Sequence, residues 1–147
     1  MIFSFTDKYR FLSNFYPSPI TYKGKSYSTV EHAYQAAKTT NEEVAELIRT
    51  ARTPGKAKYL GYAVTLRPDW DEAKEVVMLE CLRLKFQDKV LRSMLLLTYN
   101  QELYEGNDWN DTYWGVVNGR LGCKNRLGEL LMKVREEIWL ETNSKKE

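Results

Sequence analysis

The stretch Ser28–Thr39, STVEHAYQAAKT, decides how the rest of the chain is interpreted, because its residues change to a helical period. Ser28 and Glu31 have the spacing of a capping box, in which a hydroxyl and a carboxylate bind backbone N–H groups at a helix start. We therefore expect a helix over residues 28–39. On that helix Glu31, Gln35 and Lys38 share one face, so a carboxylate, an amide and an ammonium group point the same way.

Similar start signals and apolar stripes predict the other helices, which begin near Asn41, at Thr53-Pro54, at Asp69, at Leu91 and after Asn125. The segment Leu91–Thr98 is apolar on nearly every side, which favours a central position. Two short β-prone pieces around Lys23-Gly24 predict a hairpin. We expect a mainly α, compact single-domain fold of five to seven helices with a small N-terminal β-hairpin. The domain covers residues 1–140, and residues 141–147 form a frayed tail.

Composition narrows the class of protein. The chain has 147 residues, 43% hydrophobic and 29% charged, with a formal net charge of +2. These are globular values, and the small net charge argues against a protein that grips duplex DNA by its phosphates. A small net charge is compatible with a nucleotide-sized ligand, because its pocket needs only a few cations. The sequence has no membrane-length apolar run, no visible leader and only two cysteines, so we expect a cytoplasmic protein without membrane association.

The predicted helix at residues 28–39 is the first candidate site. A carboxylate at Glu31 and an amine at Lys38 in one cleft would suit acid–base or nucleophilic catalysis. The alternative is structural: Glu31 is then only a capping partner, and Lys38 is a solvated cation that suits the C-terminal end of the helix dipole. The single histidine, His32, is poor support for a metal site.

The segment 104–115 is the second candidate, with three carboxylates and four aromatic rings in a stretch that has no helical or strand period. Its aromatic faces suit a planar base, and its acids suit sugar hydroxyls or a developing cation. Alternatively, the tryptophans plug the core and the aspartates cap turns. A third, weaker candidate is Asn118–Gly128, where glycines and basic residues precede a helix start as in some phosphate sites.

Seven motifs occur in order along the chain: Leu12-Ser13-Asn14-Phe15-Tyr16-Pro17, Glu31-His32-Ala33-Tyr34-Gln35-Ala36-Ala37-Lys38, Ala57-Lys58-Tyr59-Leu60-Gly61, Arg67-Pro68-Asp69-Trp70, Lys85-Phe86, Asn107-Asp108 with Tyr113-Trp114-Gly115, and Asn125-Arg126-Leu127-Gly128-Glu129-Leu130-Leu131-Met132. From about Phe3 to Arg135 the sequence thereby resembles the NADAR family, which includes YbiA-like N-glycosidases. The resemblance implies a helical fold and hydrolysis of the bond between a ribose and a nitrogenous base. The implied substrates are ribosylamino-pyrimidine phosphates of riboflavin biosynthesis, or ADP-ribose attached to guanine, including guanine in nucleic acid.

The resemblance places five residues in the expected site, namely Asn14, Glu31, Lys38, Asp111 and Trp114. We expect Glu31 or Asp111 to stabilise the sugar cation and orient water, with Glu31 favoured because a helix fixes it. Lys38 then protonates the leaving base or forms a Schiff base with the opened sugar.

The remaining expected contacts concern binding. The base stacks on Trp114 and on Phe15 or Tyr113, Asn14 and Asn125 bind its edge or the sugar, and Arg10 or Lys56 holds phosphate. No metal, cofactor or obligate protein partner is expected. Two alternatives are a non-catalytic module that binds ADP-ribose or NAD-like ligands, and a helical interaction protein whose aromatic loop is an interface.

Overall fold

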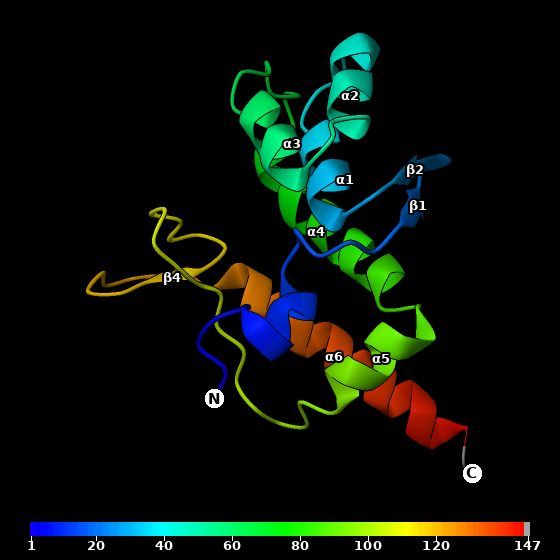
Figure 1. Cartoon of the computed structure of the whole chain (residues 1–147), viewed down its shortest axis with the longest axis vertical. Helices are drawn as coiled ribbons and strands as arrows, with labels where there is room; N and C mark the ends of the chain where they lie inside the picture. Colours follow the sequence, from blue (N-terminus) through cyan, green and yellow to red (C-terminus); the bar gives the residue numbers. More distant parts are fainter. Residues whose placement is uncertain (146–147) are drawn as a thin grey trace. The chain divides into compact units, whose positions relative to one another are not determined.

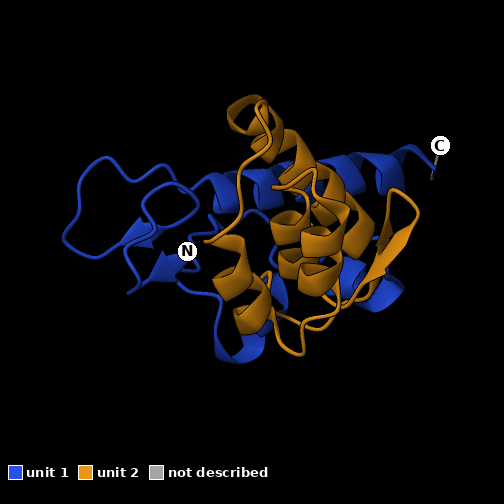
Figure 2. Ribbon diagram, turned by 90° about the horizontal axis from the view of Figure 1, so that it is seen from above, with its two compact units in different colours: residues 1–13, 86–147 blue, residues 14–85 orange. Residues whose placement is uncertain are grey.

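The computed structural model describes residues 1–145, and these residues gather into two compact units. Unit 2 is the continuous segment of residues 14–85, whereas unit 1 combines residues 1–13 with the residues from 86 onward (Figure 2). Across the described residues the structure has six α-helices, one 3-10 helix and a short antiparallel hairpin near the N-terminus. The mainly α class with a small hairpin is therefore confirmed, and the single domain over residues 1–140 stays a prediction.

Unit 2 begins with the predicted hairpin. Strands β1 (Ile20–Tyr22) and β2 (Lys25–Tyr27) pair antiparallel, with Ile20 opposite Tyr27. Lys23 and Gly24 join them with φ angles of 49° and 82°. Two successive residues with positive φ form the tight turn that matches the twist of paired strands, and glycine accepts this backbone readily. The Lys-Gly signal therefore predicted the turn correctly.

Four helices complete unit 2: α1 (Val30–Ala36), α2 (Glu42–Arg49), α3 (Pro54–Gly61) and α4 (Trp70–Lys85). Helix α1 packs against the other three (Figure 1). Two of the predicted helix starts are confirmed, because Asn41 accepts hydrogen bonds from the first turn of α2 and Thr53 accepts one from Lys56 in α3. Both caps satisfy backbone donors that a helix leaves open at its start.

The start and the end of α1 differ from the expectation. The N-cap is Thr29 rather than Ser28, and the helix ends at Ala36 rather than near residue 39. The Thr29 hydroxyl accepts a hydrogen bond from the His32 backbone N–H at 3.1 Å and also meets Nδ1 of the His32 ring at 2.8 Å, while Nε2 of that ring lies 2.9 Å from the Ala51 carbonyl beyond the helix. The capping box predicted for Ser28 and Glu31 is therefore wrong, because the N-cap is Thr29 and its hydroxyl binds the His32 N–H.

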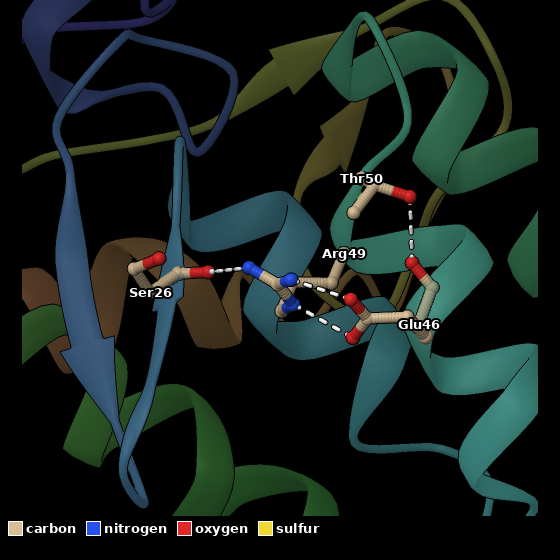
Figure 3. A network of polar contacts seen from close by, with 4 residues as sticks. All are labelled: Ser26, Glu46, Arg49 and Thr50. Atoms are coloured by element: carbon tan, nitrogen blue, oxygen red, sulfur yellow. Dashed lines mark hydrogen bonds and ion pairs between the residues drawn. The ribbon is translucent and has the colours of Figure 1, made fainter.

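One arginine of α2 connects that helix to the hairpin. The Arg49 guanidinium donates to the Ser26 carbonyl of β2 at 3.1 Å and to both carboxylate oxygens of Glu46 (Figure 3). The neighbouring Thr50 hydroxyl donates to the Glu46 carbonyl at 2.8 Å. The guanidinium lowers the pKa of Glu46 below its usual value through this paired hydrogen bond. The hairpin and α2 are thereby tied together at the surface of unit 2.

Unit 1 contains the 3-10 helix η1 (Asp7–Leu12), helices α5 (Lys89–Leu96) and α6 (Arg126–Ser144), and a two-residue parallel pair, β3 (Gly106–Asn107) with β4 (Val116–Val117). Helix α5 packs against α6. The stripe that α6 buries consists of Leu127, Leu130, Leu131, Val134 and Ile138. In α5, by contrast, only Leu91 and Leu95 are buried, while Val90 and Leu97 are exposed, so the central position expected for this segment is wrong.

The C-terminal end of α6 also differs from the expectation. The helix continues through Ser144, four residues into the segment expected to fray, and Lys145 forms an ion pair with Glu141 at 3.2 Å. Residues 146–147 of that segment lie outside the described residues. None of the helices in the described part of the chain is both long and apolar enough to cross a membrane.

Candidate active site

Glu31 is a buried carboxylate held in the first turn of α1, and only 7% of its surface is exposed. Its backbone N–H donates to the Asn14 carbonyl at 3.1 Å. Its side-chain Oε1 accepts a hydrogen bond of 2.8 Å from Nε2 of Gln35, one turn further along the helix. The first turn of a helix also favours negative charge. Glu31 is therefore a buried carboxylate held in place by a hydrogen bond, and its catalytic role stays a prediction.

The loop before the hairpin brings Asn14 to Glu31. The Asn14 amide nitrogen contacts the Met78 sulfur of α4 at 3.4 Å. Its amide oxygen Oδ1 is buried and has no hydrogen-bond partner in the part of the chain that the structure describes. A buried acceptor without a donor is unfavourable, so it fits a group that receives its partner from a ligand. The neighbouring Phe15 ring is exposed, and the Lys58 ammonium lies 6.0 Å from its centre.

Lys38 lies beyond the end of α1, in the turn that follows Ala36. The side chain is half-buried, and its Nζ lies 5.5 Å from the centre of the Tyr34 ring. That ring in turn packs against Trp70 at 5.2 Å. The Lys38 carbonyl accepts a hydrogen bond from the Arg67 backbone N–H at 2.7 Å, which fixes the turn. Because α1 is shorter than expected, Lys38 does not share a helix face with Glu31.

Lys85, in the last turn of α4, is a second amine that the expected site did not include. It is 2% exposed, and its Nζ lies 5.9 Å from the centre of the Tyr16 ring. Desolvation lowers the pKa of this amine from 10.5 to about 7. A signal for it exists in the sequence: Lys85 follows the apolar position Cys81 by four residues, so the helical period places a charged residue on the buried stripe.

In unit 1, Asp111 organises the aromatic loop. Its Oδ1 accepts hydrogen bonds from the backbone N–H groups of Tyr113 at 3.1 Å and Trp114 at 2.8 Å. The Tyr113 and Trp114 rings meet edge to face, with centres 4.9 Å apart. The Lys124 ammonium lies 5.3 Å from the centre of the Tyr113 ring. Asp111 thus caps a turn, as the structural alternative expected, and substrate binding by the two half-buried rings stays a prediction.

Asn125 holds the same loop against α6. It adopts left-handed backbone, with φ of 50°, and its buried side chain does not cap the helix. Instead its Oδ1 accepts from the Glu105 N–H at 3.1 Å, and its Nδ2 donates to the Leu103 carbonyl at 2.9 Å. A Cβ at Gly128 would overlap this amide and the Leu103 carbonyl. We therefore assign Asn125 to positioning the loop rather than to binding substrate.

Several backbone N–H groups at the start of α6 already have partners in unit 1. The N–H groups of Arg126 and Leu127 donate to the carbonyls of Tyr113 and Trp114, each at 3.0 Å, and the Lys124 N–H donates to the Thr112 carbonyl at 2.8 Å. The helix start is thus paired with the aromatic loop. These pairings argue against an anion site there, because the N–H groups of Arg126 and Leu127 are already used.

The expected site residues divide between the two units. Unit 2 holds Asn14, Phe15, Glu31, Lys38 and Lys56, and unit 1 holds Arg10, Asp111, Tyr113, Trp114 and Asn125. The two expected phosphate ligands are both exposed; Arg10 lies in η1, and the Lys56 ammonium lies 4.9 Å from the centre of the Tyr59 ring. Among residues 1–145, no three side chains of the His, Cys, Asp or Glu types gather as they would to hold a metal ion.

A buried carboxylate with an amide donor, next to an unmatched acceptor, defines a candidate hydrolytic site on a small helical fold. Comparison with known proteins agrees with this class. Residues 2–139 match the NADAR domain. The chain is 41% identical over 142 residues to the N-glycosidase YbiA of Escherichia coli, covering 95% of this chain and 88% of that protein. It is 40% identical over 136 residues to an N-glycosidase of Nostoc punctiforme, covering 88% and 86%.

A solved structure supports the same family. The NMR structure of Escherichia coli YbiA superposes with a TM-score of 0.85 and 40% identity, over 96% of this chain and 84% of that one. A riboflavin biosynthesis protein of Vibrio vulnificus is 36% identical over 135 residues, which are 90% of this chain and 36% of that protein. The chain belongs to the NADAR family. Within it the chain is a YbiA-like N-glycosidase, a hydrolase that acts on N-glycosyl bonds.

Proposed function

We propose that this N-glycosidase cleaves the bond between the C1′ atom of a ribose phosphate and a nitrogenous base. The substrates are ribosylamino-pyrimidine phosphates of riboflavin biosynthesis or ADP-ribose attached to guanine. Similarity to a riboflavin biosynthesis protein supports the first class. The free thiols of Cys81 and Cys123 agree with work in the cytoplasm. The observation that carries the chemistry is the buried Glu31 carboxylate, held by Gln35 at 2.8 Å.

Glu31 performs the central step in this proposal. When the C1′–N bond breaks, the ribose develops oxocarbenium character, and a fixed carboxylate in a desolvated position stabilises that charge and orients the attacking water. Asp111 was the other candidate for this role. Its Oδ1 already accepts two backbone hydrogen bonds from the aromatic loop, which supports a positioning role for it instead.

The leaving base needs a proton, and Lys38 supplies it in the simplest version of the mechanism. In the second version the amine replaces the base at C1′ as the sugar ring opens, which forms an imine. Water then hydrolyses the imine and releases the sugar and the free amine. Borohydride reduction during turnover distinguishes the versions, because it converts the imine into a stable adduct on one lysine. Peptide mass analysis then identifies Lys38, Lys85 or neither.

The first contacts with the substrate are assigned to the loop before the hairpin in unit 2. The orphaned acceptor of Asn14 receives a donor from the sugar or the base, and the exposed Phe15 ring supports the base. Stacking on Trp114 and Tyr113 stays a prediction, as do the phosphate contacts of Arg10 and Lys56. A base that stacks on an aromatic ring gains about 1–3 kcal/mol.

The test is substitution Glu31→Gln, assayed for base release from ribosylamino-pyrimidine phosphates and from ADP-ribosylated guanine side by side. We expect kcat to fall by on the order of 100-fold or more on the substrate that the wild type prefers. Glu43→Gln makes the same carboxylate-to-amide change at an exposed position of α2; it is the matched control and should keep full activity. Wild-type turnover by Glu31→Gln would remove Glu31 from the chemistry and overturn the proposal.

A further inference from the structure

The amide of Gln35 is held in an unusual way for a helix residue. It is 4% exposed, and its Nε2 donates to Glu31 Oε1 at 2.8 Å. Its other polar atom, Oε1, is buried and has no hydrogen-bond partner among residues 1–145. Burying an acceptor without a donor is unfavourable, and this site offers no internal compensation for it. An apolar residue would fill the position at lower free energy if packing were its only task.

The unpartnered Oε1 rests against Gly61, the last residue of α3. A Cβ built on Gly61 would overlap both Oε1 and Cδ of Gln35. Gly61 has ordinary negative φ, so backbone conformation does not require glycine there. Glycine also weakens a helix relative to alanine. Space for the Gln35 amide is therefore the physical reason for glycine at this position.

The two contacts act on the same group from opposite sides. Gly61 leaves the amide room to sit with its oxygen toward α3, and this orientation turns the Nε2 donor toward Glu31. An amide held the other way would direct an oxygen at the carboxylate and repel it. The hydrogen bond to Glu31 therefore selects the orientation of the amide, and the missing Cβ at Gly61 leaves the space in which the amide holds that position.

We propose that Gln35 is a positioning residue for the N-glycosidase reaction, and that Gly61 is the seat that keeps its amide directed at Glu31. This inference rests on the proposed function, in which the Glu31 carboxylate stabilises the sugar cation. Gln35 does not touch the reacting atoms; it fixes the plane of the carboxylate through one oxygen. A catalytic group displaced by about 1 Å can lose on the order of 100-fold in rate.

The experiment is a double-mutant cycle on kcat and KM with Gln35→Ala, Gly61→Ala and the double variant. We expect each single variant to lose about tenfold to 100-fold in kcat with little change in KM. The double variant should be no slower than Gln35→Ala alone, because the alanine at position 61 acts only by displacing the amide. Its thermal stability should also recover relative to Gly61→Ala, since the overlap is relieved.

Gly55→Ala is the matched control. It lies in the same helix, where a Cβ would meet only the Thr53 hydroxyl at 3.9 Å, so kcat should stay at the wild-type value. Rates of Gln35→Ala within twofold of wild type, or losses in the two single variants that multiply in the double, would overturn the proposal. Should Gly61→Ala not fold, Gln35→Met replaces it in the test, because methionine removes the donor at similar volume. Its kcat should fall by about tenfold to 100-fold, and a kcat equal to that of the wild type would overturn the proposal.

Failure of this inference is distinguishable from failure of the proposed function. If Glu31→Gln is inactive while Gln35→Ala is fully active, the carboxylate is catalytic but needs no positioning by Gln35. If Glu31→Gln itself turns over like the wild type, the proposed role of Glu31 fails first.

Discussion

Replacing Lys85 by methionine should change how the stability of the protein depends on pH. Burial lowers the pKa of the Lys85 amine from 10.5 to about 7, so the folded chain holds it neutral above pH 7 while the unfolded chain still binds the proton. Each unit of difference between the pKa values of the folded and unfolded states corresponds to about 1.4 kcal/mol. The full difference therefore corresponds to about 5 kcal/mol, and it disfavours the folded state most at or below pH 7.

The sign of the pH dependence follows from proton counting. Between pH 7 and pH 10.5 the unfolded chain binds more protons at this position, so the free energy of unfolding of the wild type rises with pH. From pH 7 to pH 9 this contribution amounts to about 2 kcal/mol. Methionine has a similar volume and does not titrate. The stability of Lys85→Met relative to the wild type should therefore decrease by about that amount over the same range.

Urea unfolding at pH 7, 8 and 9 measures this difference, and groups that titrate equally in both proteins cancel. Lys133→Met, on the exposed face of α6, is the control and should show a constant difference from the wild type. A gap between the wild type and Lys85→Met that is constant within about 0.5 kcal/mol from pH 7 to pH 9 would refute the reasoning, because then the folded amine keeps its ordinary pKa.

Two further predictions concern the aromatic loop. Trp114→Ala should weaken substrate binding by about 1–3 kcal/mol, because it removes a face on which the base stacks; titration followed by tryptophan fluorescence and KM measures this, and unchanged affinity would assign Trp114 to packing alone. Asn125→Ala should lower the free energy of unfolding by about 1–3 kcal/mol, because the Glu105 N–H and the Leu103 carbonyl each lose their partner. Denaturant unfolding tests it against the exposed control Asn118→Ala, and equal stability of the two variants would contradict it.

Local signals predicted most of the helices, because a cap and an apolar stripe act within a few residues of each other. Asn41 and Thr53 cap α2 and α3 as expected, and the stripe of α6 is buried throughout. Burial of α5 was not predictable in the same way. A segment apolar on nearly every side does not indicate which side the rest of the fold covers, and Val90 and Leu97 stay exposed.

The site was predictable to the extent that it depends on local order. The motif around Glu31 led to the carboxylate, but α1 ends at Ala36, so Lys38 lies in the turn that follows the helix rather than within it. The contact of Gln35 with Gly61 joins residues 26 positions apart, on two helices, and no spacing rule connects them. Lys85, by contrast, was predictable from the sequence, because the helical period places it on the buried stripe of α4, but it was not included in the expected site.

Backbone hydrogen bonds pair residues 112–114 with residues 124–127 and divide the segment between them into a held base and an exposed outer part. The backbone of Trp114 takes part in these bonds, whereas residues 118–122 are all exposed, Leu121 by 99%. A Cβ at Gly119 or Gly122 would meet no neighbour within 4 Å, but the φ angles of 77° and 75° favour glycine at these two positions. Substitution of Leu121, the most exposed residue of this outer part, should therefore leave the backbone hydrogen bonds at residues 112–114 intact.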